Sequence, residues 1–238
     1  MSLSVDEKLI RNYEHYYDQK DNTAEWRRLG AMDKCANIVR LCSRLEHNHT
    51  LDIGCGEGAV IERLATLGFG SRFTGLEISS SGVRMVQEKN IRGVDVQLFD
   101  GYELPFQERP FDLAILSHVL EHVEYPRRLI HEAARAAKNV FVEVPLEDNW
   151  RLSADFVFDR VGHINFYNSK GIRRLVQSCG MRIIGAHLSH SSKSSYIYRK
   201  GKFRGTLSYF TKESGLRLWP IGAANIFTYN YSLTYTKE

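Results

Sequence analysis

The most informative stretch of this chain is Leu51-Asp52-Ile53-Gly54-Cys55-Gly56-Glu57-Gly58, where an apolar strand pattern runs directly into a loop with glycine at every second position. Glycine has no Cβ, so such a loop turns sharply and its backbone approaches a ligand closely. A helix that begins near residue 58 would present free backbone N–H groups to an anionic group. The stretch therefore predicts a nucleotide-type cofactor loop. With Ala59 it also satisfies the G-x-G-x-x-A pattern of dinucleotide sites, which leaves that alternative open.

Strand and helix patterns alternate on the carboxyl-terminal side of this loop. The predicted strands cover 50–53, 73–78, 94–99, 111–116, 140–144, 181–188 and 227–235. The predicted helices cover 6–18, 24–45, 58–67, 80–89, 119–123, 126–137 and 170–178. This order predicts an α/β fold with helices on both faces of a parallel sheet. The last strand alternates apolar and polar residues, which predicts antiparallel pairing and one wetter face.

Length and composition indicate one large domain. The chain has 238 residues, of which 43% are hydrophobic and 25% charged, so disordered and disulfide-stapled classes are excluded. We divide it into N-terminal helices that could form a lid (1–48), a cofactor-binding core (49–145) and a C-terminal part of the same domain with substrate-side loops (146–238). The sequence shows no signal peptide or membrane-spanning run, and its four cysteines lack paired spacing, so a cytoplasmic location is expected.

Positive charge is concentrated in the last third of the chain. Residues 151–238 carry 14 Lys and Arg against 4 Asp and Glu, whereas residues 1–150 carry 18 against 24. Within this third, the segment 189–224 interleaves cations with aromatic rings and is expected to be a partly helical insertion. Such a segment is compatible with a solvated face, an anionic substrate, single-stranded RNA, a membrane surface or a dimer contact.

Two acidic residues stand where predicted strands end. Glu77 ends the second strand, 19 residues after Gly58, which is the position of a carboxylate that accepts the hydroxyls of a ribose. Asp100, followed by Gly101, ends the third strand and could accept a hydrogen bond from an adenine amino group. The spacing of these acids does not by itself distinguish the two cofactor types.

The chain resembles the class I S-adenosylmethionine-dependent methyltransferases, in particular the type 11 and type 12 small-molecule enzymes. The residues that carry the resemblance are Leu51–Gly58, Leu76-Glu77-Ile78, Asp100 with Leu104-Pro105-Phe106, and Phe111–Val123, which together lie within about residues 50–145. The resemblance implies a Rossmann-like, doubly wound, seven-stranded sheet of order 3-2-1-4-5-7-6 with an antiparallel last strand. It also implies that the glycine loop receives the methionine part of the cofactor, Glu77 the ribose and Asp100 the adenine.

The predicted cofactor is therefore S-adenosylmethionine, with S-adenosylhomocysteine as product. The predicted cofactor-binding residues are Asp52, Gly54, Cys55, Gly56, Gly58, Glu77, Ile78, Asp100, Gly101 and Ser117. Asp52 favours this cofactor over NAD, because its charge would attract amino and sulfonium groups and would repel two phosphates.

Three histidines raise the question of a base or a metal. His118-Val119-Leu120-Glu121-His122 matches the H-x-x-E-H zinc pattern of one metalloprotease group. It begins where an apolar strand ends, however, and no third ligand is evident on a second helix, so no metal is expected. His118 and His163 are instead the candidate catalytic residues, because an acceptor hydroxyl would have to lose its proton.

The predicted activity is in-line methyl transfer to a small-molecule or glycan-type acceptor, for which an anionic acceptor is one interpretation. The alternatives are an RNA methyltransferase, an NAD-dependent oxidoreductase and a cofactor-binding protein without chemistry. The sequence leaves open the acceptor, the use of a base, the role of segment 189–224 and the oligomeric state.

Overall fold

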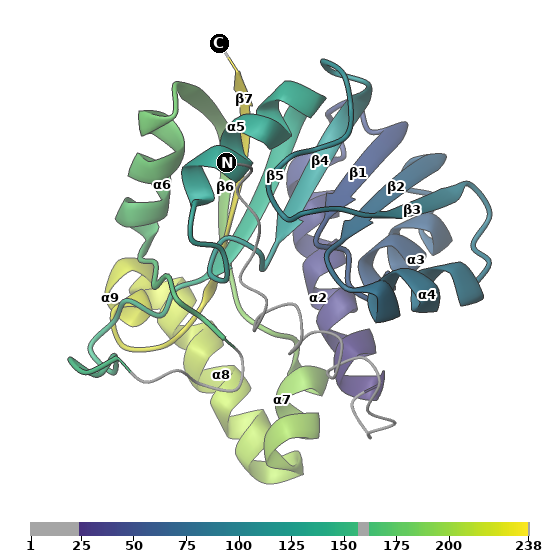
Figure 1. The fold of residues 1–238 in the computed structure, drawn as a ribbon. Helices are drawn as coiled ribbons and strands as arrows, with labels where there is room; N and C mark the ends of the chain where they lie inside the picture. Colours follow the sequence, from purple (N-terminus) through teal and green to yellow (C-terminus); the bar gives the residue numbers. More distant parts are fainter. Residues whose placement is uncertain (1–23, 157–161, 238) are drawn as a thin grey trace.

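A seven-stranded sheet forms the centre of the molecule in the computed structural model, which describes residues 24–156 and 162–237 (Figure 1). The strands are β1 His49–Ile53, β2 Arg72–Glu77, β3 Val94–Leu98, β4 Phe111–Ser117, β5 Ala137–Pro145, β6 Met181–Ser189 and β7 Asn230–Lys237. They lie in the order β3-β2-β1-β4-β5-β7-β6. Strands β1 to β5 pair in parallel, and β7 pairs antiparallel with β5 and β6. The predicted fold class and strand order are confirmed.

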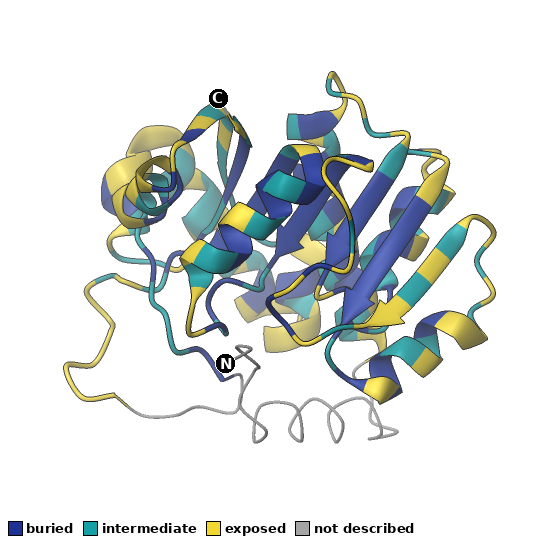
Figure 2. Cartoon of the chain, turned by 45° about the horizontal axis from the view of Figure 1, so that its top comes forward, coloured by how far each residue is buried: buried dark blue, intermediate teal, exposed yellow. Residues whose placement is uncertain are grey.

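Helices cover both faces of the sheet. They are α2 Ala24–Cys42, α3 Ala59–Thr66, α4 Ser80–Glu88, α5 Pro126–Ala136, α6 Ser169–Ser178, α7 Lys193–Lys200, α8 Lys202–Leu218 and α9 Pro220–Ala224. One buried cluster joins a face of the sheet to α5 and α6, through Leu129 and Ile172 among others. A second cluster joins the opposite face to α2 and α3, through Ile38 and Ile61. The central strands are therefore buried on both sides, as their dark blue colour in Figure 2 shows, which explains their apolar sequences.

The polar side of β7 is buried, contrary to the predicted wetter face. Ser232 and Thr234 are as inaccessible as their neighbours Leu233 and Tyr235. The reason is that β7 lies between β5 and β6 inside the sheet, and its polar side chains find buried partners. The hydroxyl of Ser232, for example, donates a hydrogen bond of 2.7 Å to Glu143. An alternating sequence can thus belong to an internal strand when its polar groups are paired.

Residues 119–123 form a turn and not the predicted helix. The backbone of His118 has a φ of 59°, outside the helical region. The carbonyl oxygen of Glu121 accepts hydrogen bonds from the backbone N–H groups of Ile164 and Asn165, at 2.8 and 3.0 Å. A neighbouring segment therefore uses the carbonyl that a continuing helix would have needed for its own ladder. The predicted helix 6–18 lies outside the described residues.

The carboxyl ends of the parallel strands meet at one edge of the sheet, where ligands of open α/β sheets bind. In the strand register, Asn230 of β7 lies opposite both Pro145 of β5 and Ser189 of β6. The chain between β6 and β7 therefore leaves and re-enters the sheet at this edge. It contains α7, α8 and α9, which confirms the expected partly helical insertion, and Figure 1 shows these helices beyond the end of the sheet. Across the described ranges, no helix combines the length and apolar character needed to span a membrane.

Candidate active site

The glycine loop connects β1 to α3 with three left-handed glycines. The φ angles of Gly54, Gly56 and Gly58 are 74°, 56° and 75°, values that side chains rarely permit. A Cβ added at Gly54 would lie 2.9 Å from Val119, and one added at Gly58 would lie 2.9 Å from Val86. The loop is therefore a close-packed turn in which only glycine fits, as a tight cofactor cradle requires.

Glu77 fastens this loop to the end of β2. One oxygen of its carboxylate accepts a hydrogen bond of 2.8 Å from the N–H of Gly56. The other oxygen accepts from the N–H and the hydroxyl of Ser79, at 3.1 and 3.0 Å. Burial raises the pKa of Glu77, while these hydrogen bonds oppose the rise. A carboxylate has about four acceptor positions, so these three donors leave about one position for a hydroxyl group of a ribose.

Asp52 supplies a second buried carboxyl beside the loop, on β1. Its side chain is on the opposite side of the strand from the core residues Leu51 and Ile53. Burial raises the pKa of Asp52 to about 7; the positive charge of Lys34 opposes this rise and the negative charge of Glu77 adds to it. A bound cationic group would favour the ionised form of Asp52, in keeping with the predicted affinity for amino and sulfonium groups.

Asp100 braces the turn that follows β3. One of its carboxylate oxygens accepts hydrogen bonds from the N–H groups of Tyr102 and Glu103, at 2.8 and 2.7 Å. This local turn is favoured by the left-handed Gly101, whose φ is 93°. The predicted adenine contact of Asp100 stays a prediction, as do the predicted contacts of Cys55, Ile78 and Ser117. The hydroxyl of Ser117 is buried at the end of β4 and has no hydrogen-bond partner among the residues that the structure describes, so it is available to a ligand there.

His118 lies between two fully buried carboxylates. Its Nδ1 is 3.1 Å from Glu121, and its Nε2 is 3.3 Å from Glu143. Burial alone would lower the pKa of His118, but the two carboxylates outweigh burial and raise it. Glu143 is in turn held by Asn37 and Ser232, which donate hydrogen bonds of 2.6 and 2.7 Å to its other oxygen. The arrangement favours a protonated His118, whose two ring N–H groups face these carboxylates, and it disfavours a role as base.

His163 has the geometry expected of a base. Its Nδ1 lies 2.6 Å from a carboxylate oxygen of Glu147, so the Glu147 side chain orients the ring. The ring of His122 packs edge-on against it, with centroids 4.8 Å apart, and Nδ1 of His122 lies 3.1 Å from the carbonyl oxygen of Gly162. A carboxylate that orients a histidine recurs in sites where that histidine accepts a proton.

The histidines of the H-x-x-E-H pattern do not converge on one point as a metalloprotease would need. His118 pairs with Glu121 and Glu143, whereas His122 turns toward Gly162 and His163. A different trio, Glu121, His122 and His163, brings one possible ligand atom from each residue within 4.8 Å of the others. Among the described residues, these three could together hold a cation at this edge of the sheet.

Sequence reasoning missed the glutamates of this site, namely Glu121 as a partner of His118, together with Glu143 and Glu147. Glu143 could have been recognised from the sequence, because it is a single charge inside the apolar run 140–144. A charge in such a strand needs a buried partner, and that partner could have been sought among the histidines. The sequence pattern does not single out Glu147, because it follows the strand as an ordinary loop residue.

Fold and site together define a class of protein, the class I S-adenosylmethionine-dependent methyltransferases. The sheet order, the glycine cradle after β1 and the acid at the end of β2 fit this cofactor, and the buried Asp52 suits its positive charges. The family model of the methyltransferase domain matches residues 24–185. The chain belongs to this methyltransferase domain family.

Individual relatives agree with this assignment. A ubiquinone biosynthesis O-methyltransferase of Coxiella burnetii is 25% identical over 189 residues, which cover 71% of this chain and 79% of that protein. A fatty-acid O-methyltransferase of Mycolicibacterium smegmatis is 33% identical over 84 residues, or 35% of this chain and 30% of the relative. An uncharacterized protein of Methanocaldococcus jannaschii is 25% identical over 139 residues, and the match covers 57% of this chain and 57% of that protein.

Solved structures with low sequence identity share the fold. The [4+2]-cyclase SpnF has a TM-score of 0.65 at 17% identity, and the match covers 92% of this chain and 85% of the cyclase chain. A phosphoethanolamine N-methyltransferase of Haemonchus contortus, in complex with phosphomonomethylethanolamine and S-adenosylhomocysteine, has a TM-score of 0.64 at 16% identity. That match covers 94% of this chain and 60% of the other. At such identities the likeness concerns the fold alone, and the cyclase shows that one fold serves different reactions.

Proposed function

We propose that this protein transfers the methyl group of S-adenosylmethionine to a hydroxyl oxygen of a small-molecule or glycan-type acceptor. The observation that carries the proposal is the contact of 2.6 Å between His163 and Glu147. A hydroxyl acceptor must lose its proton during transfer, and an oriented neutral imidazole is suited to remove it. The names of the ubiquinone and fatty-acid relatives, both O-methyltransferases, support an oxygen acceptor.

The reaction is an in-line displacement for which the protein mainly supplies positioning. The bound cofactor supplies a methyl group on a sulfonium, together with a thioether leaving group. The glycine loop and Glu77 hold the cofactor side, and His163 faces the acceptor side. As the new O–CH₃ bond forms and the S–CH₃ bond breaks, the hydroxyl proton passes to His163, whose ring Glu147 keeps in place. Positioning of this kind is worth about 7 to 11 kcal/mol, and a general base adds about 10²- to 10⁴-fold.

His118 takes a different part in this proposal. Because Glu121 and Glu143 favour its protonated form, we assign it a positioning role at the end of β4, with Ser117 beside it. It would hold the turn 119–123, because its two ring nitrogens face the carboxylates of Glu121 and Glu143. The backbone N–H of His118 donates to the carbonyl oxygen of Glu143 at 2.9 Å, which fixes its place between β4 and β5.

The proposal is tested by measuring cofactor binding and methyl transfer separately in the wild-type protein and in His163→Gln. Calorimetry with S-adenosylmethionine and S-adenosylhomocysteine should show binding to the wild-type protein and to His163→Gln alike. Formation of S-adenosylhomocysteine with hydroxyl acceptors should fall about 10²-fold or more in His163→Gln. His131→Gln, which changes an exposed histidine on α5, is the matched control and should keep its activity. Full activity of His163→Gln would show that His163 is not the base.

A second arm of the same experiment tests the trio of Glu121, His122 and His163. If His163 acts as a base, transfer should survive dialysis against a chelator. If activity is lost and a divalent cation restores it, the trio is a metal site and the base role is wrong. Binding of NAD, or of RNA in preference to small acceptors, would favour the corresponding alternative functions. Cofactor binding without turnover on any acceptor would favour a protein that keeps the fold without the chemistry.

A further inference from the structure

Helix α8 exposes large apolar side chains along one side. Phe203, Leu207, Phe210 and Leu218 follow at positions i, i+4, i+7 and i+15 of this 17-residue helix, so they share one face. Their exposed fractions are 82%, 60%, 53% and 85%. We call these four residues the apolar stripe. One exposed leucine is ordinary, but four large apolar side chains exposed on one face of a helix are typical of an interaction site.

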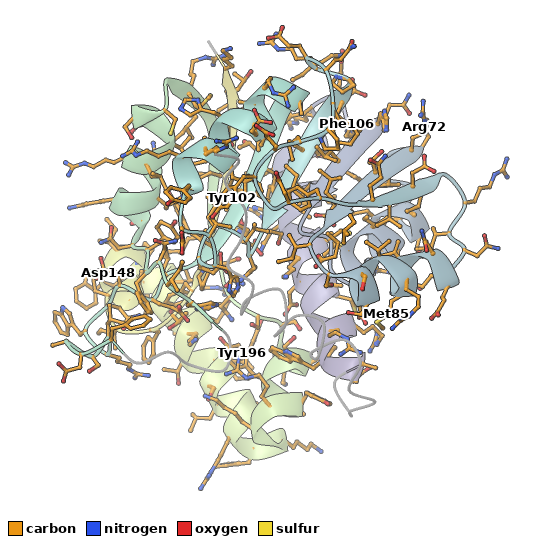
Figure 3. All side chains as sticks on the ribbon, viewed as in Figure 1. Arg72, Met85, Tyr102, Phe106, Asp148 and Tyr196 are labelled. Atoms are coloured by element: carbon orange, nitrogen blue, oxygen red, sulfur yellow. The ribbon has the colours of Figure 1, made fainter. Side chains whose placement is uncertain are left out.

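The opposite side of α8 is already fixed to the domain. The ring of Tyr209 packs against that of His190, with centroids 5.2 Å apart, and the carboxylate of Glu213 lies 3.0 Å from Nε2 of His190. The hydroxyl of Tyr229 donates a hydrogen bond of 2.8 Å to the carbonyl oxygen of Lys212. Tyr196 of α7, labelled in Figure 3, packs against the same cluster. The inner face therefore holds the helix in place, and the apolar stripe is not needed for packing.

Positive charges flank the apolar stripe. The segment 189–224 contains seven Lys and Arg residues and a single acid, Glu213. Lys202 and Arg204 are neighbours of Phe203, about 100° to either side of it around the helix axis. Lys193 places its ammonium group 5.4 Å from the ring centroid of Phe210. Long cationic side chains can lay their alkyl stems beside an apolar face and extend their charged heads to phosphates.

The exposed apolar surface continues from α8 onto its neighbours. Trp219 and Ile221, at the junction of α8 and α9, are 61% and 75% exposed. Trp150, in the loop after β5, is 80% exposed. Its backbone N–H donates a hydrogen bond to the carbonyl oxygen of Asn225, just after α9. Figure 1 shows this loop beside α9, with α8 next to it. All of these elements lie at the carboxyl edge of the sheet, the edge that carries the candidate active site.

We propose that the apolar stripe and its flanking cations dock this protein on the surface of an anionic phospholipid bilayer. Leucine, isoleucine and tryptophan side chains enter the boundary between headgroups and acyl chains, while Lys and Arg bind the lipid phosphates. RNA fits less well, because the aliphatic members of the surface offer no ring on which a base can stack. A second copy of the chain also fits less well, since it would bring two strongly basic segments face to face. The docking does not depend on the methyl transfer proposed above.

Docking would set the candidate active site at the bilayer surface. The chain enters α7 directly from the end of β6 and returns from α9 to the start of β7, at the edge where β1 and β4 also end. Asp33 of α2 fixes α7 to this edge by accepting a hydrogen bond of 2.7 Å from the hydroxyl of Ser195. The insertion is therefore tied to the sheet, and a membrane under α8 would lie near the mouth of the site.

Flotation with unilamellar vesicles tests the proposal on the full chain. Vesicles of phosphatidylcholine with a fraction of phosphatidylglycerol should bind the wild-type protein, and pure phosphatidylcholine vesicles should bind it more weakly. The double variant Phe203→Ser with Leu207→Ser should lose about tenfold or more of its binding. The matched control is Leu67→Ser, whose leucine is 48% exposed at the end of α3, on the opposite edge of the sheet.

A charge variant tests the electrostatic half of the proposal. Lys202→Glu with Arg204→Glu should lower binding to the anionic vesicles about tenfold or more, while Arg72→Glu with Arg92→Glu, at the amino edge of the sheet, should not. Unchanged thermal unfolding and cofactor binding would show that the variants are folded. The proposal is overturned if the wild-type protein binds neither vesicle type. It is also overturned if the apolar variant only converts a dimer to a monomer, or only weakens RNA binding, with vesicle binding unchanged.

Discussion

The carboxylate of Glu77 and the backbone N–H of Gly56 form a buried hydrogen bond of 2.8 Å that joins the end of β2 to the cofactor loop after β1. These residues are 21 positions apart in the sequence and belong to neighbouring strands. The same carboxylate also holds Ser79 at the start of α4. One side chain therefore positions two elements of the cofactor site, in addition to the ribose contact predicted for it.

Replacing this side chain should weaken cofactor binding. In Glu77→Ala, the loss of charged hydrogen bonds should reduce the affinity for S-adenosylmethionine by about 1.5 to 3 kcal/mol, measured by calorimetry. Glu62→Ala, which removes an exposed carboxylate on α3, is the control and should bind normally. If Glu77→Ala lost stability but kept its affinity, the residue would only brace the loop, and the ribose would be placed elsewhere.

The close packing of the loop makes Gly58 hard to replace. Gly58→Ala combines a left-handed residue, which costs about 1 to 2 kcal/mol, with a Cβ only 2.9 Å from Val86. Gly180 has the same φ of 75°, but a Cβ there would meet no atom of the described residues within 4 Å, so Gly180→Ala measures the backbone strain alone. Chemical unfolding should show a larger loss for Gly58→Ala. Equal losses would mean that Val86 moves aside without cost.

The pKa of Asp52 predicts a pH dependence of cofactor binding. Burial raises this pKa to about 7, and a bound cation would stabilise the ionised carboxyl. Affinity for S-adenosylmethionine should therefore increase as the pH rises through about 7, and less so for S-adenosylhomocysteine, which lacks the sulfonium charge. Asp52→Asn should flatten the profile obtained by calorimetry at several pH values. The same profile in wild type and variant would show that Asp52 is not near the cofactor charge.

The carboxylates around His118 predict a pH-dependent contribution to stability. Because the folded protein raises the pKa of His118, its stabilising effect is complete below the unfolded pKa of about 6.5 and is lost as the pH rises through the folded value. His118→Asn leaves Glu121 and Glu143 without their cation, which should cost about 3 kcal/mol at acidic to neutral pH. Urea unfolding at several pH values, with His131→Asn as control, measures the difference. A difference that grew with rising pH would contradict the assigned direction.

The fold could be predicted largely from local patterns. The largely apolar run at residues 111–116 and the apolar face of α5 identify a buried strand and an amphipathic helix without reference to any other part of the chain. The turn at 119–123 was predicted wrongly as a helix, because the competing hydrogen bonds to Glu121 come from Ile164 and Asn165, more than 40 residues away. The buried polar face of β7 was missed for the same reason, since its partner Glu143 belongs to another strand.

The sequence by itself determined the α/β class, the glycine loop and the acidic residue that ends β2, because each depends on the conformational preferences and periodicity of neighbouring residues. Only the tertiary structure decided which groups the titratable side chains contact: His118 lies between two buried glutamates, and His163 lies against Glu147. It also decided that the apolar stripe of α8 is exposed. Those relationships join segments far apart in the chain. The free energy of each depends on distance and burial, which a local pattern does not contain.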